Sequence, residues 1–379
     1  MRVPESILVV VTQRIGDVLL ATPLIRSLHR GWPAARIDVL VFENTEGVLS
    51  GNPDIDRVLT VPRQRRFWSH LRFLARLFRQ YDLAVTTQTG DRPVLYTWVA
   101  ARRRAGLRAP RRKEWWKTRL LTHSAAFDNL HTHTVLMNLA IADLLSIPRH
   151  PEVVVAWTGE EEAALNACLP FDSRTQPFAL LHTYPKFSYK MWTRQGWREL
   201  AYWLHAQGLR IVLSGSNDAE ELAYVRALAE ILPPDTVNAA GTLSLGQTAC
   251  LAGRARLYVG PDTALTHVAA AAGTPTVALY GPSNPVKWGP WPAQYRGERN
   301  PYLMHGCQQV GNVLLLQGSG PCVPCMEEGC ERHVRSLSRC LQDLPPDTVI
   351  DAARRMLATA AAGQAAGCSI DSAAAEKRT

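Results

Sequence analysis

Residues 7–30 read ILVVVTQRIGDVLLATPLIRSLHR, and this stretch decides the fold class. Ile7–Val11 is a short run of apolar, mostly β-branched residues, which is typical of a buried strand. Over Asp17–Arg30 the apolar residues recur at helical spacing, and Gly31 and Pro33 predict the end of that helix. A buried strand followed directly by a helix is the repeating unit of a parallel α/β sheet.

The alternation of strands and helices continues along the chain and then restarts. In the first half, further strands are predicted at Ile37–Phe42, Arg57–Val61, Leu83–Thr87 and Ala105–Arg108. After Pro170, strands are predicted at Phe178–His182, Ile211–Ser214, Leu257–Val259 and Thr276–Tyr280, with helices at Gln195–Ala206, Ala219–Ile231 and Leu265–Ala272. This pattern predicts two Rossmann-like, doubly wound domains, over residues 1–170 and 171–357. Residues 358–379, rich in Ala, Ser and Gly, are expected to form a flexible tail.

Length and composition agree with two domains. The chain has 379 residues, 46% of them hydrophobic and 20% charged, which excludes a largely disordered, collagen-like or disulfide-framework protein. No run approaches the roughly 18 apolar residues of a membrane helix, and the first apolar run is too short for a secretion signal. We therefore expect a soluble, cytosolic protein.

The net charge of +9 is concentrated in one region. Between Arg63 and Arg119 there are sixteen Arg or Lys residues and three acids, a local charge of +13, with several aromatic residues among them. Such a region suits anionic lipid, an anionic saccharide or nucleic acid, although a merely solvated surface is the alternative. Helical spacing predicts that one apolar face is made of Phe67, Leu71, Leu74 and Phe78.

Five of the eight cysteines lie within residues 307–340. The order is Cys322-x2-Cys325-x4-Cys330-x9-Cys340, after Cys307. This thiol density suits structural zinc or an iron–sulfur cluster. A loop tied by disulfides and a set of free thiols are the alternatives, and a reducing compartment would disfavour permanent disulfides.

The first motif that could take part in binding or catalysis is Thr12–Asp17, between the first strand and its helix. In open α/β sheets ligands bind beyond the carboxyl ends of strands. Gly16 allows a ligand to approach the backbone, and the Asp17 carboxylate can either project toward a ligand or cap the helix. No G-x-G-x-x-G and no Walker loop occur here, which disfavours dehydrogenases and nucleotide hydrolases.

The second motif is Val259–His267, where a strand ends in a Gly-Pro turn. Asp262 and Thr263 occupy the start of the next helix, whose free N–H groups and dipole suit a diphosphate. A capped helix with a core histidine at position 267 is the structural alternative. Gly281–Pro285 repeats the same strand-to-turn pattern.

The third motif is His182-Thr183-Tyr184, also at a strand end and followed by Lys190. A lysine there can neutralise phosphate, or it can be an ordinary surface lysine. Glu220 and Glu221 follow the next strand, where an acid can hold ribose hydroxyls or simply favour a helix start.

Together these motifs resemble glycosyltransferase family 9, the heptosyltransferases of lipopolysaccharide core synthesis. The resemblance covers about residues 5–357. It is carried by Arg14-Ile15-Gly16-Asp17, Gly51-Asn52-Pro53-Asp54-Ile55-Asp56, Lys190-x-Trp192, Gly260-Pro261-Asp262-Thr263 through His267, and Tyr280-Gly281-Pro282-Ser283-Asn284-Pro285. The cysteine pattern also looks like one found in many members. Ala264 departs from the glycine that many relatives carry after the Asp-Thr pair.

The resemblance implies a GT-B fold with an acceptor-binding first domain and an ADP-heptose-binding second domain. It implies inverting transfer without a metal, with Asp17 as general base and Lys190 at the diphosphate. The donor-binding residues expected from it are Thr183, Glu220 or Glu221, Gly260, Asp262, Thr263 and His267. The residues expected to bind the acceptor or a phosphate are Arg14, Gly16, Arg63, Arg65 and Arg66.

The implied partners are an ADP-sugar, a lipopolysaccharide core or lipid A-type acceptor, and anionic lipid at the inner face of the cytoplasmic membrane. No nucleic-acid partner is expected. The alternatives are a transferase that uses another nucleotide sugar for a different surface glycan, and a nucleic-acid-binding protein that uses the basic region. An inactive scaffold of the same fold is disfavoured by the intact Asp17, Lys190 and Asp262.

Overall fold

The computed structural model describes residues 2–61, 67–109 and 115–375. The chain divides into two compact units. The first comprises Met1–Glu162, Ser244–Ala249 and Val286–Pro301, and the second comprises Ala163–Leu243, Cys250–Pro285 and Tyr302–Thr379. The single boundary predicted between residues 170 and 171 did not anticipate the two short segments that join the first unit.

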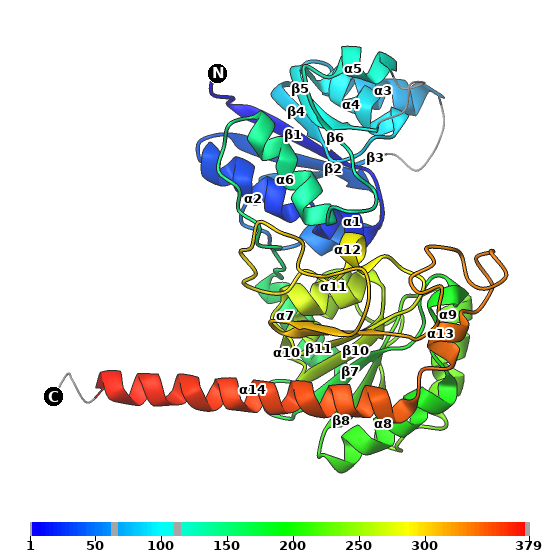
Figure 1. The fold of residues 1–379 in the computed structure, drawn as a ribbon. Coiled ribbons are helices and arrows are strands. Elements are labelled where there is room, and N and C mark those ends of the chain that lie inside the picture. The colour runs from blue at the N-terminus through cyan, green and yellow to red at the C-terminus, as the bar shows by residue number, and fades with distance from the viewer. Residues whose placement is uncertain (1, 62–66, 110–114, 376–379) are drawn as a thin grey trace. The chain divides into compact units, whose positions relative to one another are not determined.

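The first unit contains a six-stranded parallel sheet in the order β3-β2-β1-β4-β5-β6 (Figure 1). Its strands are β1 (Ser6–Val11), β2 (Arg36–Phe42), β3 (Arg57–Val61), β4 (Tyr81–Thr86), β5 (Ala101–Arg108) and β6 (His123–Ala126). The order reverses beside β1, which pairs with both β2 and β4. This is the doubly wound order in which ligands bind at the reversal point.

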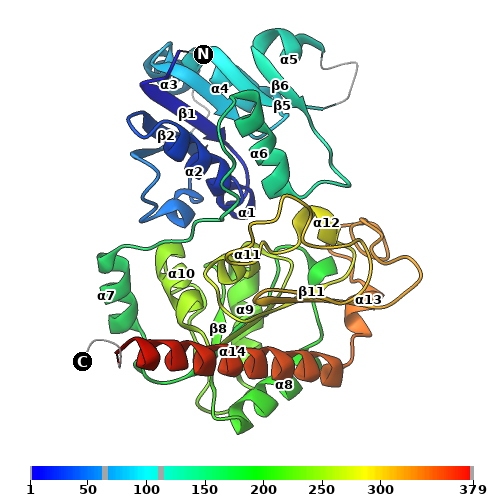
Figure 2. The ribbon, with the colours of Figure 1, turned by 60° about the vertical axis from the view of Figure 1, so that its left-hand side comes forward.

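Helices cover the sheet of the first unit. They are α1 (Ile15–Leu19), α2 (Thr22–Gly31), α3 (Phe67–Leu77), α4 (Asp91–Ala100), α5 (Trp115–Leu120), α6 (Thr134–Leu144) and α12 (Pro285–Trp288), with a 3₁₀ turn η1 at Glu46–Leu49. Helices α3 and α4 pack on one face, around Leu8, Val10 and Ala84. Helices α2 and α6 lie against each other (Figure 2).

A segment from late in the chain completes this unit. Trp291, in Val286–Pro301, is 1% exposed and packs with Leu20, Val135 and Leu139. Its ring also lies 4.8 Å from that of His133, centroid to centroid. Burying an aromatic side chain of this size contributes about 1.5–3 kcal/mol, so the segment belongs to the first core.

The helix predicted over Asp17–Arg30 is in fact two helices, α1 and α2, that meet at Leu20 and Ala21. Pro23 has no N–H and cannot occupy a helix interior, so it lies in the first turn of α2. The hydroxyl of Thr22 donates to the backbone oxygen of Leu19 at 2.7 Å, which closes the break.

The apolar face predicted for α3 is only partly correct. Leu71 is 46% exposed and Phe78, just beyond the helix, is 57% exposed. Leu74, which the prediction included, does pack on the core, but Phe73 and the buried Leu77 pack there with it. Tyr96 of α4 lies against the Phe73 ring, with the two rings at 89°. Spacing along α3 could not reveal which stripe α4 would cover.

The second unit contains a seven-stranded sheet in the order β12-β13-β11-β10-β7-β8-β9. Its strands are β7 (Phe178–His182), β8 (Arg210–Ser214), β9 (Val237–Asn238), β10 (Leu257–Pro261), β11 (Thr276–Tyr280), β12 (Gln308–Val310) and β13 (Val313–Gln317). All pairings are parallel except that of β12 with β13. Counted from β7, the parallel strands repeat the order of the first unit, with the reversal between β7 and β10.

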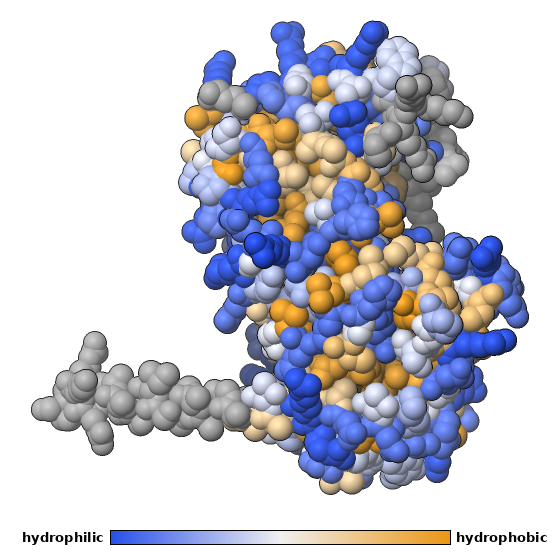
Figure 3. Space-filling model, in the orientation of Figure 1, coloured by the Kyte–Doolittle hydropathy of each residue, from blue (hydrophilic) through white to orange (hydrophobic). Residues whose placement is uncertain are grey.

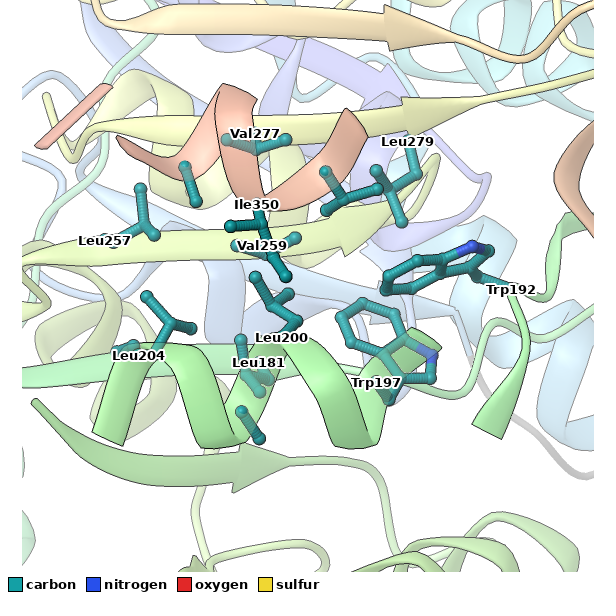
Figure 4. Close-up of a cluster of buried hydrophobic side chains, with 14 of the residues drawn as sticks. Leu181, Trp192, Trp197, Leu200, Leu204, Leu257, Val259, Val277, Leu279 and Ile350 are labelled. Carbon is teal, nitrogen blue, oxygen red and sulfur yellow. The ribbon is translucent and has the colours of Figure 1, made fainter. Parts of the chain in front are cut away.

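The core of the second unit lies between this sheet and helices α8 and α14 (Figure 4). The remaining helical elements of the chain are α7 (Gly159–Cys168), η3 (Ser188–Lys190), α8 (Arg194–Ala206), α9 (Ala219–Ala229), α10 (Leu245–Arg254), α11 (Ala264–Ala271), α13 (Arg339–Gln342) and α14 (Pro346–Ala375). Residues of α7 and α10 are divided between the two units. Trp192 and Trp197 meet edge to face with centroids 5.0 Å apart. Ile350 packs from α14 against Val259 and Val277 of the sheet.

The prediction of a flexible tail at residues 358–379 needs correction. Residues 358–375 continue α14 as helix, and residues 376–379 lie outside the described part of the chain. The segment is rich in alanine, which has the highest helix propensity, and the prediction of a tail did not take this propensity into account. Among the residues described, no helix is both long and apolar enough to cross a bilayer.

Candidate active site

In the first unit, the reversal point of the sheet lies between β1 and β4. The loops that follow these strands are joined because the backbone N–H and hydroxyl of Thr12 both donate to Oε1 of Gln88, at 3.1 and 3.2 Å. Gln88 was not singled out in the sequence, although it directly follows the strand predicted at Leu83–Thr87. This edge is where the doubly wound fold places ligands.

Asp17 lies at this edge in the first turn of α1. The helix cap is Arg14, so Asp17 is not the cap residue that the alternative interpretation allowed. Its carboxylate instead accepts a hydrogen bond from the backbone N–H of Arg14. Burial raises the pKa of Asp17, and the charges of Arg14 and Lys287 partly oppose that rise. A carboxylate with a raised pKa is a stronger base for abstracting a proton from a hydroxyl.

The structure brings three predicted acceptor-side residues into one turn: Arg14, Gly16 and Asp17. Arg14 is exposed and Gly16 is half-buried. The other three predicted residues, Arg63, Arg65 and Arg66, lie outside the described residues.

A buried lysine near Asp17 was missed by the sequence analysis. Lys287 is 2% exposed, and its Nζ donates to the backbone oxygen of Asp128 at 3.0 Å. Burial lowers the pKa of Lys287 to about 8, with Asp128 and Asp17 opposing that fall. A signal was present, because this lysine stands between Val286 and Trp288 in an otherwise apolar stretch.

In the second unit, the reversal point between β7 and β10 carries an ion pair. The Nζ of Lys190 lies 2.5 Å from Oδ2 of Asp262 and also donates to the backbone oxygen of Asp262 at 3.3 Å. Burial is the largest single influence on the pKa of Asp262 and raises it, but the charge and hydrogen bond of Lys190, with smaller contributions from neighbouring side chains, together lower it. The Tyr280 hydroxyl donates to Oδ1 of Asp262 at 3.3 Å. Lys190 is therefore held at the strand edge rather than free on the surface.

Residues that follow β10 surround this pair. Burial lowers the pKa of His267 to about 4, so the imidazole is neutral, and its Nδ1 has no hydrogen-bond partner among the described residues. Thr263 is the cap residue of α11, yet its side chain makes no capping hydrogen bond. Gly260 is needed for packing, because a Cβ there would come within 2.3 Å of the Tyr258 hydroxyl.

Two further predicted donor residues present unpaired polar atoms at the same edge. Thr183 is fully buried, and within the described part of the chain its hydroxyl has no partner. Glu221 is 7% exposed; one carboxylate oxygen accepts from the Ser216 hydroxyl, and the other has no partner among the residues described. Glu220 is exposed. The structure thus separates the two glutamates, and Glu221 is the one directed into the unit.

The cysteine segment contains free thiols. Cys322, Cys325, Cys330 and Cys340 are unpaired, and within the described residues no group of three metal-binding side chains could hold an ion. The four are nonetheless neighbours: burial and the other three thiols raise the pKa of Cys340 to about 11. The segment also touches the loop at the end of β11, because the Met326 N–H donates to the Pro282 oxygen at 2.8 Å.

Two doubly wound units of equal strand order, each with polar residues at its reversal point, form the GT-B fold, which the solved family 9 and heptosyltransferase structures share. The family model of glycosyltransferase family 9 (heptosyltransferase) matches residues 70–314, and the chain belongs to that family.

Individual relatives agree with this assignment. Lipopolysaccharide heptosyltransferase 3 from Escherichia coli is 26% identical over 285 residues, which cover 73% of this chain and 83% of that protein. Lipopolysaccharide heptosyltransferase 1 from Pseudomonas aeruginosa is 28% identical over 360 residues, 89% of this chain and 91% of the relative. The solved E. coli ADP-heptose lipopolysaccharide heptosyltransferase II has a TM-score of 0.72 at 21% identity, covering 93% and 99% of the two chains.

Proposed function

We propose that this glycosyltransferase moves heptose from ADP-heptose to a lipopolysaccharide core acceptor, with inversion at the anomeric carbon. The observation that carries the proposal is Asp17, a carboxylate of raised pKa at the reversal point of the first sheet. The names of the similar proteins supply the donor and the acceptor class. A transferase that uses another nucleotide sugar is the competing proposal.

The donor side would consist of the residues around the Lys190–Asp262 pair. An ammonium group has three N–H donors, and Lys190 directs two of them at Asp262, which leaves one for a phosphate oxygen. The start of α11 can support the second phosphate through its backbone N–H groups. The unpaired oxygen of Glu221 suits a ribose hydroxyl, and the unpaired Thr183 hydroxyl can donate to the nucleotide.

In the transfer step, the acceptor hydroxyl would give its proton to the Asp17 carboxylate. Its oxygen forms a bond to the anomeric carbon from the face opposite ADP, while the bond from that carbon to the diphosphate breaks. The electron pair leaves with ADP, whose added charge is stabilised by Lys190 and by helix N–H groups. In this proposal the positive groups of the chain stand where other transferases use a metal, so no cofactor is required.

We also propose that the enzyme works at the cytoplasmic face of an anionic membrane. Helix α4 lies between α3 and α5 in the first unit. These helices form what we call the basic surface, defined by the exposed residues Arg72, Arg76, Arg92, Arg119, Trp68, Trp98 and Trp115. Arginines suit lipid phosphates and tryptophans suit the headgroup layer, so this surface can contact the membrane that holds the acceptor. Figure 3 shows hydrophilic side chains projecting from this part of the first unit.

The test combines donor binding with transfer. Calorimetric titration with ADP, UDP, GDP and ADP-heptose should show selective binding of ADP, tightened by the heptose. The Asp17→Asn variant should bind ADP-heptose normally but transfer at least about 100-fold more slowly, because it lacks the general base. As a control, Asp143→Asn removes an exposed carboxylate of α6 that pairs with Arg149, and it should retain activity.

Each failure has its own meaning. Preference for UDP or GDP would mean that the protein is a glycosyltransferase whose donor is a different nucleotide sugar. Full transfer by Asp17→Asn would refute the role of Asp17 as base. Binding of mixed-sequence DNA with a steep salt dependence, without nucleotide binding, would indicate that the basic region binds nucleic acid.

A further inference from the structure

The carboxylate of Glu221 does not take the part that its place in α9 would give it. Asp218 is the cap residue of α9, and its Oδ1 accepts from the backbone N–H groups of Glu220 and Glu221 at 3.0 and 3.2 Å. Glu221 is the third residue of the helix, where a glutamate ordinarily completes a capping box by accepting from the N–H of the cap residue. Here that N–H donates instead to the Ser216 hydroxyl, at 3.2 Å.

Helix α10 of the same chain shows the ordinary arrangement. Gln247 is its third residue, and the Gln247 Oε1 accepts from the backbone N–H of Ser244 at 2.7 Å. In return the Ser244 hydroxyl accepts from the backbone N–H of Gln247 at 3.2 Å. Both side chains of this capping box serve the helix start. In α9 the corresponding backbone group is satisfied by Ser216, which leaves the Glu221 carboxylate available for another partner.

The Ser216 hydroxyl also fixes which oxygen of Glu221 remains unpaired. While it accepts from the N–H of Asp218, it donates its single proton to Oε2 of Glu221. The Glu221 side chain is buried, and its Oε1 has no hydrogen-bond partner among the described residues. A buried charged oxygen without a partner is unfavourable, and a ligand that donates a hydrogen bond to Oε1 would remove this cost.

The unpaired oxygen lies at the edge of the sheet where ligands bind. A Cβ on Gly215 would come within 2.8 Å of Oε1 of Glu221, so this oxygen lies against the backbone directly after β8. Ser214, the last residue of β8, pairs with His182, the last residue of β7, and β7 borders the reversal point. The missing side chain at Gly215 leaves the space that the carboxylate occupies. Ser216 and Gly215 therefore determine the position of Glu221 together.

We propose that Ser216 is a positioning residue for the donor nucleotide, whose hydroxyl holds Oε2 of Glu221 and thereby directs Oε1 at the ribose hydroxyls. This inference rests on the proposed function, in which the second unit binds the nucleotide of the donor. An ionised carboxylate accepts hydrogen bonds and donates none. Its unpaired oxygen therefore favours a sugar that carries hydroxyl groups over a deoxy sugar. Ser216 sets this preference through Glu221, without contact to the nucleotide.

The test is calorimetric binding of ADP and of dideoxy-ADP, which lacks both ribose hydroxyls, to the wild type, Ser216→Ala and Ser216→Thr. The wild type should bind ADP at least about tenfold more tightly than dideoxy-ADP, because the latter loses a hydrogen bond to a charged group. In Ser216→Ala the N–H of Asp218 becomes available to Glu221, and the ordinary capping box turns the carboxylate away from the ribose. The affinity ratio of the two nucleotides should then fall to about twofold or less. Ser216→Thr keeps the hydroxyl and should keep the wild-type ratio.

Two controls separate positioning from folding. The Tm of Ser216→Ala should stay close to that of the wild type, because the new capping box replaces the lost hydrogen bonds. Ser244→Ala removes the cap of α10 and should lower the Tm without changing the affinity ratio. An unchanged ratio in Ser216→Ala, or equal binding of both nucleotides by the wild type, would overturn the inference. A wild-type protein that binds no ADP would refute the proposed function, and the inference with it.

Discussion

The Lys190–Asp262 ion pair gives a sharp test of what holds the second unit together. Replacing Lys190 by methionine leaves the Asp262 carboxylate buried without its cation. Breaking a fully buried pair costs about 3–5 kcal/mol, and partial exposure reduces that to about 2–3 kcal/mol here. The exposed fractions behind this reduction are 19% for the Lys190 side chain and 9% for that of Asp262. For a unit of this size the loss corresponds to a fall in Tm of roughly 4–12 °C.

Thermal unfolding of four proteins measures this effect: the wild type, Lys190→Met, Asp262→Asn and the double variant. Because the second substitution removes the charge that the first leaves unpaired, the double variant should lose less stability than the sum of the single losses. Lys186→Met is the matched control, since Lys186 is an exposed lysine in the same loop. Equal Tm values for Lys190→Met and Lys186→Met, or additive losses in the cycle, would refute the reasoning.

The pH dependence of this stability has a definite sign. The pKa of Asp262 is lowered in the folded chain because Lys190 and the neighbouring side chains together outweigh burial, the largest single influence. A group with a lowered folded pKa stabilises the fold above its unfolded pKa, about 3.9 for Asp, and this stabilisation is lost as the pH falls through the folded value. The difference in unfolding free energy between the wild type and Lys190→Met should therefore shrink as the pH drops below about 4.

Two further predictions concern packing and membrane contact. Gly196→Ala should lower the unfolding free energy by about 1–3 kcal/mol, because its Cβ would lie 2.3 Å from Cζ2 of Trp192; Gly159→Ala, with open space around it, should change stability by less than about 1 kcal/mol. Circular dichroism melts would check both, and equal losses would contradict the packing argument. The Trp68→Ser/Trp115→Ser variant should bind phosphatidylglycerol vesicles several-fold more weakly in sedimentation, with neither protein binding pure phosphatidylcholine. Unchanged binding would show that these tryptophans do not contribute to membrane contact.

Much of the fold could be predicted because its strands are short apolar runs between turn residues. Phe178–His182 and Thr276–Tyr280 match β7 and β11 in their bounds. Errors arose where a tertiary contact or a single residue overrides periodicity. Pro23 divides one predicted helix into two, and α4 selects the buried stripe of α3. The edge strand β6 has half-buried polar positions, and the sequence carries no strong signal for it.

The candidate site was predictable where it follows strand ends. Asp17 and Asp262 both lie in turn-to-helix segments that follow predicted strands, at the reversal points of the two sheets. Lys287 could not be assigned in the same way, because its burial depends on Phe127 and Asp128, about 160 positions earlier in the chain. The choice between Glu220 and Glu221 also required the structure, since only the direction of each side chain separates them.

Because Trp291, late in the chain, packs in the core of the first unit, there is a consequence for biosynthesis and engineering. A ribosome that has made the first 170 residues has not yet made the indole that fills the space beside Leu20 and Val135. The first unit can complete its core only after Pro301 has been synthesised, when most of the second unit already exists. A chimera that exchanges this unit between family members must therefore exchange Val286–Pro301 as well.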